Sequence, residues 1–131
     1  MNLAKVVTAT LAGLALFSTG SSLLYSAQAA AVLPHAYYVA EFEVTDPEGI
    51  QPYSTHVEST FKSYGGHFIV RGGKTISLEG DAPKRRRVVI EFDSVEKAQA
   101  WYNSPEYTEL RKIRQRSAKA DVYLIEGVVE K

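Results

Sequence analysis

The sequence contains no cysteine among its 131 residues, which excludes disulfide bridges, thiolate metal sites and cysteine nucleophiles. Its three histidines, His35, His56 and His67, lie far apart, and none has the spacing of a metal-binding motif. No nucleophile elbow, phosphate loop or dinucleotide fingerprint occurs. The sequence therefore predicts no metal and no cofactor, and it leaves open whether the protein is an enzyme.

The N-terminal part almost lacks charge, because Lys5 is the only charged side chain before Glu41. Residues 6–17 are almost wholly apolar or small, and Ala27-Gln28-Ala29 matches the small-x-small pattern that a signal peptidase cleaves. These features predict a cleaved signal peptide over residues 1–29 and a periplasmic or secreted protein. The alternative is a retained membrane anchor. A spanning helix needs about 20 apolar residues, and polar residues and a glycine interrupt this run after Phe17.

The chain also lacks an excess of either charge. Loss of the leader removes Lys5 and leaves 14 basic and 15 acidic side chains. A near-neutral domain has no general attraction to nucleic acid or to an anionic membrane, so we expect neither partner for the mature protein. The basic run of residues 84–87 could contact phosphate. A solvated turn also explains it, since no aromatic residue interleaves it.

Apolar periodicity divides the rest of the chain into strands and helices. We expect a flexible lead-in over residues 30–36 and one domain over 37–131. Strands are predicted at 37–44, at 67–70 with a bend at 71–73 and a continuation at 75–79, at 87–92 and at 121–127. One helix is predicted from Asp46-Pro47-Glu48 to Gly65-Gly66, and a second from the Ser94 cap, restarted by Ser104-Pro105, to about 118. This β-α-β-β-α-β order predicts an α+β, ferredoxin-like sandwich with both helices on one face of an antiparallel sheet.

Side-chain alternation assigns the strand residues to two faces of this sheet. One face is nearly all apolar and is assigned to the helices and the core; it holds Tyr38, Ala40, Phe42, Phe68, Val70, Val88, Ile90, Phe92, Val122 and Leu124. The other face mixes charged and apolar residues, namely Tyr37, Val39, Glu41, His67, Ile69, Arg71, Arg87, Val89, Glu91, Tyr123 and Ile125. Such a mixture suits neither a solvated face nor a buried core. We predict that a second copy of the chain covers it, which gives a homodimer. The alternative is a monomer whose outer face tolerates some apolar residues.

Several short motifs occur in a fixed order along the chain. Arg71-Gly72-Gly73, Glu79-Gly80 and Ser104-Pro105-Glu106-Tyr107 follow Asp46-Pro47 and precede Glu126-Gly127. This combination resembles the family of domains of unknown function numbered 1330, over about residues 37–128. The resemblance implies a dimeric α/β barrel, related in fold to small monooxygenase-like and stress-response barrels, and it implies no activity. Two features depart from the family. Many members lack a leader, and an acid is common at the position of Asn103.

The mixed sheet face carries most of the candidate site residues. Its charged side chains could bind an anionic ligand or transfer a proton, or they could form interface salt bridges that define the register. The catalytic candidates are His67, Arg71 and Glu91, and the candidate ligand contacts on this face are Glu41, Arg71 and Arg87. The glycines after Arg71 could hold an anion, or they could form a β-bulge.

Trp101 and Tyr107 complete the candidate ligand contacts. They could line a pocket between a helix and the sheet, although core packing also explains them. Two functions remain open: an exported homodimeric module that binds a small ligand or serves a stress response, and a cofactor-independent, monooxygenase-like enzyme acting on a small aromatic or carbonyl compound. An apolar pocket with a convergent histidine or arginine would favour the enzyme, and a filled core would favour the binding module.

Overall fold

The structure, a computed structural model, describes residues 30–129. Its elements in chain order are β1 (Ala36–Val44), α1 (Gln51–Lys62), β2 (His67–Arg71), β3 (Arg86–Phe92), α2 (Val95–Tyr102), α3 (Pro105–Ser117) and β4 (Ala118–Glu126). This order confirms the predicted α+β class, with α2 and α3 as the two parts of the interrupted helix. The predicted signal peptide, residues 1–29, lies outside the described residues.

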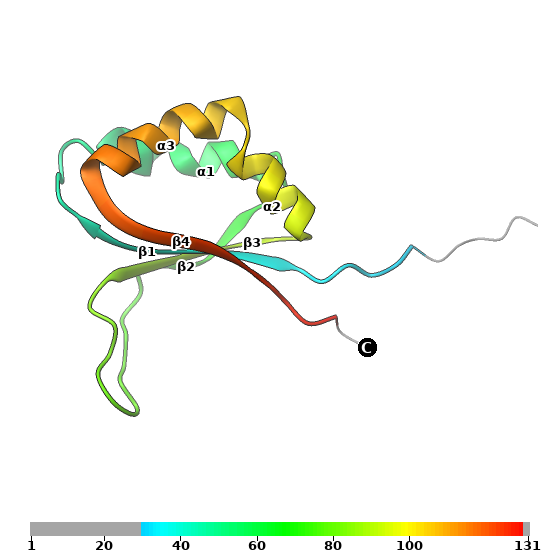
Figure 1. The fold of residues 1–131 in the computed structure, drawn as a ribbon, viewed down its shortest axis with the longest axis horizontal. Coiled ribbons are helices and arrows are strands. Elements are labelled where there is room, and N and C mark those ends of the chain that lie inside the picture. The colour runs from blue at the N-terminus through cyan, green and yellow to red at the C-terminus, as the bar shows by residue number, and fades with distance from the viewer. Residues whose placement is uncertain (1–29, 130–131) are drawn as a thin grey trace, which may run out of the picture. The chain divides into compact units, whose positions relative to one another are not determined.

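The four strands form one antiparallel sheet in the order β2-β3-β1-β4. β1 is central, so Tyr38 lies opposite both Ile90 of β3 and Leu124 of β4. The helices of the described chain cover the same face of the sheet, and the loop of residues 72–85 projects on the opposite side (Figure 1). The fold is therefore the predicted ferredoxin-like sandwich, with one covered sheet face and one open sheet face.

The helices α2 and α3 begin at the predicted caps. Ser94 Oγ accepts a hydrogen bond from Lys97 N at 3.2 Å, and Ser104 Oγ accepts one from Tyr107 N at 3.3 Å. Pro105 occupies the first turn of α3. Backbone N–H groups in a first turn have no acceptor within the helix, so the N–H that proline lacks costs no hydrogen bond. These local contacts explain why both boundaries could be predicted from sequence.

The helix α1 starts later than predicted. Asp46 Oδ1 accepts a hydrogen bond from Gly49 N at 2.9 Å and so caps a turn over residues 47–50 instead of the helix. The helix begins at Gln51, with Pro52 in its first turn. A single turn presents the same free N–H groups as a helix start, so Asp46-Pro47-Glu48 suits both. The helix ends at Lys62, and a turn over residues 63–65 follows it to the predicted stop at Gly65, whose φ of +77° favours glycine.

The strand β2 is shorter than predicted, and its irregularity lies elsewhere. It ends at Arg71, and residues 75–79 form no strand. The register shifts between Phe68 and Val70, so that Val70 lies opposite Val89 and Arg71 lies opposite Val88. One extra residue in a strand reverses the side to which the following side chains point. The predicted faces of Val70 and Arg71 are therefore wrong: Arg71 points to the helix side and Val70 to the open side.

Aromatic rings dominate the core between the helices and the sheet. Trp101 of α2 is fully buried and stacks on Phe92 with 5.4 Å between the ring centroids. Its indole N–H donates a hydrogen bond to Thr60 Oγ1 of α1 at 2.9 Å, so the buried donor is satisfied. This cluster joins α1 and α2 and borders the cavity that forms the candidate site.

Candidate ligand-binding site

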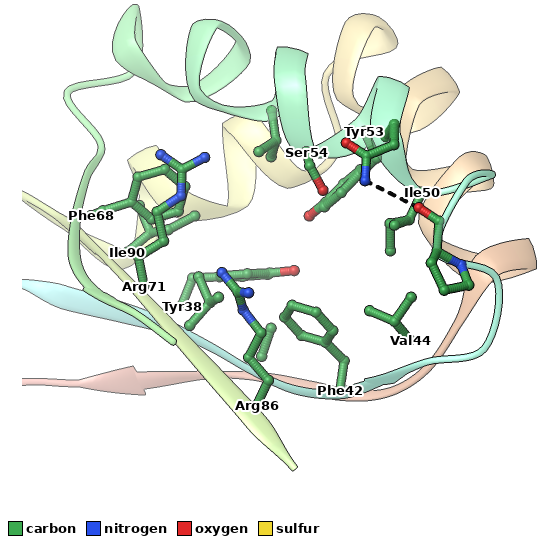
Figure 2. A pocket seen from close by; sticks show the side chains of 15 residues that line it. Tyr38, Phe42, Val44, Ile50, Tyr53, Ser54, Phe68, Arg71, Arg86 and Ile90 are labelled. Carbon is green, nitrogen blue, oxygen red and sulfur yellow. Dashed lines mark hydrogen bonds between the residues drawn. The ribbon is translucent and has the colours of Figure 1, made fainter. Parts of the chain in front are cut away.

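A cavity of about 410 Å³ lies between α1 and the covered face of the sheet, and we term it the α1 pocket (Figure 2). Small side chains help to keep it open, since larger residues in place of Ala40 on β1 and Ser54 on α1 would fill it. Its volume and its largely apolar lining with a few polar groups are typical of small-molecule sites. The lining residues are Tyr38, Ala40, Phe42, Val44, Pro47, Ile50, Gln51, Tyr53, Ser54, Val57, Phe68, Arg71, Arg86, Val88 and Ile90.

Arg71 enters the α1 pocket because of the shift in β2. Its guanidinium carbon lies 4.5 Å from the centroid of the Phe68 ring, and its Nη1 lies 3.5 Å from Glu58 Oε2 on α1. Both members of this ion pair are nearly half exposed, so water screens their attraction. Arg71 is therefore a charged group at the solvent-exposed mouth of the pocket, held by its contact with the Phe68 ring and by a weak ion pair.

Arg86 was not predicted as a site residue, yet it also lines the α1 pocket. It lies opposite Phe42 in the register of β1 and β3, with its guanidinium carbon 5.8 Å from the Phe42 ring centroid. Its side chain reaches from β3 toward Tyr38 (Figure 2). Among the described residues, no acidic side chain forms an ion pair with it. The alternation that places Val88 on the covered face also places Arg86 there. Arg86 was missed because the basic run of residues 84–87 was interpreted as a solvated turn.

Three tyrosine hydroxyl groups meet where the α1 pocket borders the core, and we term them the tyrosine triad. Tyr107 Oη of α3 lies 3.1 Å from Tyr38 Oη and 3.4 Å from Tyr53 Oη. Tyr38 and Tyr53 line the pocket, whereas Tyr107 is fully buried behind them. Burial, and after it the adjacent Tyr107, raises the pKa of Tyr38 and of Tyr53 well above the usual value. Both hydroxyls therefore stay protonated and can donate hydrogen bonds at neutral pH.

Arg114 of α3 is buried beside the tyrosine triad. Its side chain is only 4% exposed, and its Nε has no hydrogen-bond partner. Burial lowers the pKa of this guanidinium, but the three tyrosine oxygens raise it, and the net shift is upward. Within residues 30–129 no carboxylate forms an ion pair with Arg114. It is therefore a buried positive charge that the tyrosine triad, and no carboxylate, accompanies.

The open sheet face holds the other predicted charges, and the structure pairs them across neighbouring strands. Glu91 contacts two histidines, with Oε1 2.6 Å from His35 Nδ1 and Oε2 3.1 Å from His67 Nε2. The hydrogen bond with His35 is the largest cause that lowers the pKa of Glu91. Arg87 Nε donates a hydrogen bond to Glu41 Oε1 at 2.8 Å. These contacts form within one chain and do not by themselves define a ligand site.

The predicted site residues do not converge on one site. His67 and Glu91 lie on the open sheet face, and Arg71 lies on the covered face. Trp101 and Tyr107 are fully buried with their ring centroids 4.0 Å apart, and neither lines the α1 pocket. Tyr107 contributes to the site only through its hydroxyl group in the tyrosine triad.

Tyr38, Tyr53 and Arg114 were not predicted as site residues. One signal was present, because Tyr107 and Arg114 are separated by two helical turns and so share a face of α3. This pattern was missed because the helix dipole already explains arginine residues near the C-terminal end of a helix. The convergence of Tyr38, Tyr53 and Tyr107 from three different elements had no local signal.

Residues 30–129 lack two further features. No group of three or more His, Asp or Glu side chains there is arranged to hold a metal ion. In the same range, no helix combines the length and the apolar character that a membrane crossing requires.

Comparison with known proteins relates the chain to one family and to several solved structures. Residues 35–128 match the family described as Domain of unknown function (DUF1330). No curated protein matches the chain. A protein of unknown function from Rhodopseudomonas palustris is 18% identical, with a TM-score of 0.58 over 74% of this chain and 85% of that one.

Two other solved structures share the fold. SnoaB, a cofactor-independent oxygenase from Streptomyces nogalater, is 12% identical, with a TM-score of 0.53 over 75% of this chain and 95% of its own. A protein from Arabidopsis thaliana is 17% identical, with a TM-score of 0.51 over 73% of this chain and 96% of its own. At these identities the similarity shows the fold alone.

Proposed function

This chain belongs to the DUF1330 family of domains of unknown function, and from this premise we propose that it is an exported homodimer whose α1 pocket binds a small, largely apolar molecule. The cavity of about 410 Å³ is the observation that carries the proposal. Its apolar walls can remove a ligand's carbon skeleton from water, which is the main favourable term in binding of such molecules. A role in a stress response stays a prediction.

Ligand binding can be tested by placing a bulky side chain in the cavity. The wild-type protein is screened by two-dimensional NMR against small aromatic and alicyclic compounds, and we expect shifts of signals from Ala40 and Val57, which line the pocket. Ser54→Phe fills the cavity from α1 and should abolish these shifts. Ser59→Phe is the matched control, because Ser59 lies on the same helix, is exposed and does not line the pocket. Shifts that persist in Ser54→Phe would place the ligand elsewhere.

A second candidate function is a cofactor-independent enzyme of the kind that SnoaB is described to be. The observation that favours it is the convergence of Arg71, Arg86 and two tyrosine hydroxyls on an apolar cavity. Cations and hydrogen-bond donors held beside such a cavity can stabilise negative charge that develops on a reacting molecule. Oxygen uptake with hydroxyaromatic and dicarbonyl compounds measures this activity. We expect Arg71→Gln and Arg86→Gln to lower kcat, and Arg85→Gln, which lies outside the pocket, to leave it unchanged.

The homodimer is proposed from the composition of the open sheet face. Val70, Tyr123 and Ile125 project there and are 39%, 44% and 49% exposed. The pairs Glu41–Arg87 and His67–Glu91 of the same face form within one chain. A second copy can therefore cover these pairs without separating their charges.

Export is proposed from the N-terminal sequence alone. If the predicted leader is removed after Ala29, the mature chain begins at Ala30. Mass spectrometry of the protein recovered from its own host, separated into periplasmic or culture-medium and cytoplasmic fractions, measures both the terminus and the compartment. A chain that still begins at Met1 would contradict a cleaved leader.

A further inference from the structure

The polar end of the α1 pocket has more hydrogen-bond donors than it can use. The tyrosine triad contains three hydroxyl protons but only two oxygen–oxygen contacts, Tyr38 with Tyr107 and Tyr53 with Tyr107. Each contact consumes one proton, so at least one hydroxyl proton has no acceptor inside the triad. The acceptor for that proton must lie outside the triad, and Tyr38 and the partly buried Tyr53 both line the α1 pocket.

Arg114 decides where that proton points. Its positive charge lies beside the three tyrosine oxygens, attracts their lone pairs and repels their protons. This repulsion disfavours a spare proton on Tyr107, which is a hydrogen-bond partner of Arg114. Tyr107 therefore donates to one of the other two tyrosines and accepts from the other, and the spare proton belongs to Tyr38 or Tyr53, whose rings both line the α1 pocket. In this arrangement the triad can present one O–H donor to the cavity, with the buried cation Arg114 beside the triad.

The charges at the pocket's mouth have a weaker effect. Arg71 and Arg86 are exposed, and Glu58 partly neutralises Arg71. Water screens charges at the surface, whereas a charge inside the protein acts through a lower effective dielectric. The inner end of the cavity, and not its mouth, should therefore favour negative charge most strongly.

We propose that the α1 pocket takes a monoanionic ligand, an aromatic or alicyclic molecule whose carboxylate or ionised enol or phenol oxygen accepts a hydrogen bond from the spare hydroxyl proton of Tyr38 or Tyr53. The anion supplies both the missing acceptor and a counter-charge for Arg114. The inference rests on the proposed ligand-binding function and adds the chemical class of the ligand.

A pair of probes with one ring system, one anionic and one neutral, tests the preference of the pocket for an anion. 2-Naphthoate and 2-naphthamide have the same ring system, and their dissociation constants for the full-length mature protein are measured by NMR titration at neutral pH. We expect wild-type protein to bind the carboxylate at least about tenfold more tightly than the amide. Equal affinities would overturn the anion inference and leave the pocket proposal standing. Binding of neither probe would contradict both.

Variants locate the anion within the pocket. The double variant Tyr38→Phe with Tyr53→Phe keeps both rings and removes the donors, so the preference for naphthoate should disappear while the affinity for naphthamide is kept. If the double variant does not fold, Tyr53→Phe alone should reduce the preference, because the Tyr53 side chain is only partly buried. Tyr64→Phe, outside the pocket, is the control and should keep the preference for naphthoate. A preference that survives in the double variant but vanishes in Arg71→Gln with Arg86→Gln would overturn the inference and place the anion at the mouth.

Discussion

On the open sheet face, Glu91 shows how a charged side chain finds its partners on neighbouring segments of the sheet. Glu91 accepts contacts from His35, just before β1, and from His67, at the start of β2. The sequence placed His67 and Glu91 on the same sheet face, because side chains alternate along each strand. His35 was placed in the lead-in, and its contact with Glu91 depends on how the chain enters the sheet.

Glu91 makes stability depend on pH in a defined direction. Its pKa in the folded protein lies below the usual 4.5, chiefly because of the hydrogen bond with His35. The stabilisation from ionised Glu91 is therefore fully present above the unfolded pKa and is lost as the pH falls through the lower folded pKa. We expect the free energy of urea unfolding to fall more steeply from about pH 5 to about pH 3 in wild type than in Glu91→Gln.

The comparison of wild type with Glu91→Gln contains its own control at neutral pH. Between about pH 7 and about pH 8 the carboxyl group of Glu91 is ionised in both the folded and the unfolded chain, so wild type and Glu91→Gln should show parallel pH dependence there. Identical slopes in the acidic range would contradict the role of Glu91.

At the scale of elements, helix ends were more predictable than strand ends. The caps Ser94 and Ser104 act on N–H groups three residues along the chain, so their signal is local. The shift in β2 between Phe68 and Val70 depends on pairing with β3, which is distant in sequence. Periodicity alone could not reveal it, and the predicted face of Arg71 was wrong for this reason.

The cap of α3 has a measurable contribution. Ser104→Ala removes the oxygen that accepts the Tyr107 N–H hydrogen bond, and we expect a loss of about 1 kcal/mol in the free energy of unfolding. Because α3 carries Tyr107 and Arg114, fraying of its first turn should also disturb the tyrosine triad. Ser59→Ala, at an exposed position within α1, is the control and should change stability by less than about 0.5 kcal/mol. Equal effects of the two substitutions would argue against the cap.

At the scale of the whole molecule, assembly is the main expectation that follows from the fold. A sheet with one face covered by helices leaves the other to solvent or to a partner. If a second copy covers the open sheet face, Ile125→Glu places a new charge in that interface. We expect wild type to sediment as a dimer at micromolar concentration and Ile125→Glu as a monomer.

The matched control for assembly is Gln115→Glu on α3. Gln115 is exposed on a helix, on the other side of the sheet from the open face, and the substitution introduces the same charge. We expect this variant to remain dimeric. A monomeric wild-type protein would refute the homodimer, and loss of the dimer in both variants would show that the effect is not specific to the open face.

The sequence by itself determined the order of the elements, the caps of α2 and α3, the class of the fold and most of the covered face, because these follow from local hydrogen bonds and from periodicity along one element. Only the tertiary structure decided the direction of Arg71, the α1 pocket and the meeting of Tyr38, Tyr53 and Tyr107 beside Arg114. Those features depend on strand register and on how α1 and α3 pack over the sheet. Packing joins residues far apart in the chain, and no local pattern specifies which of them meet.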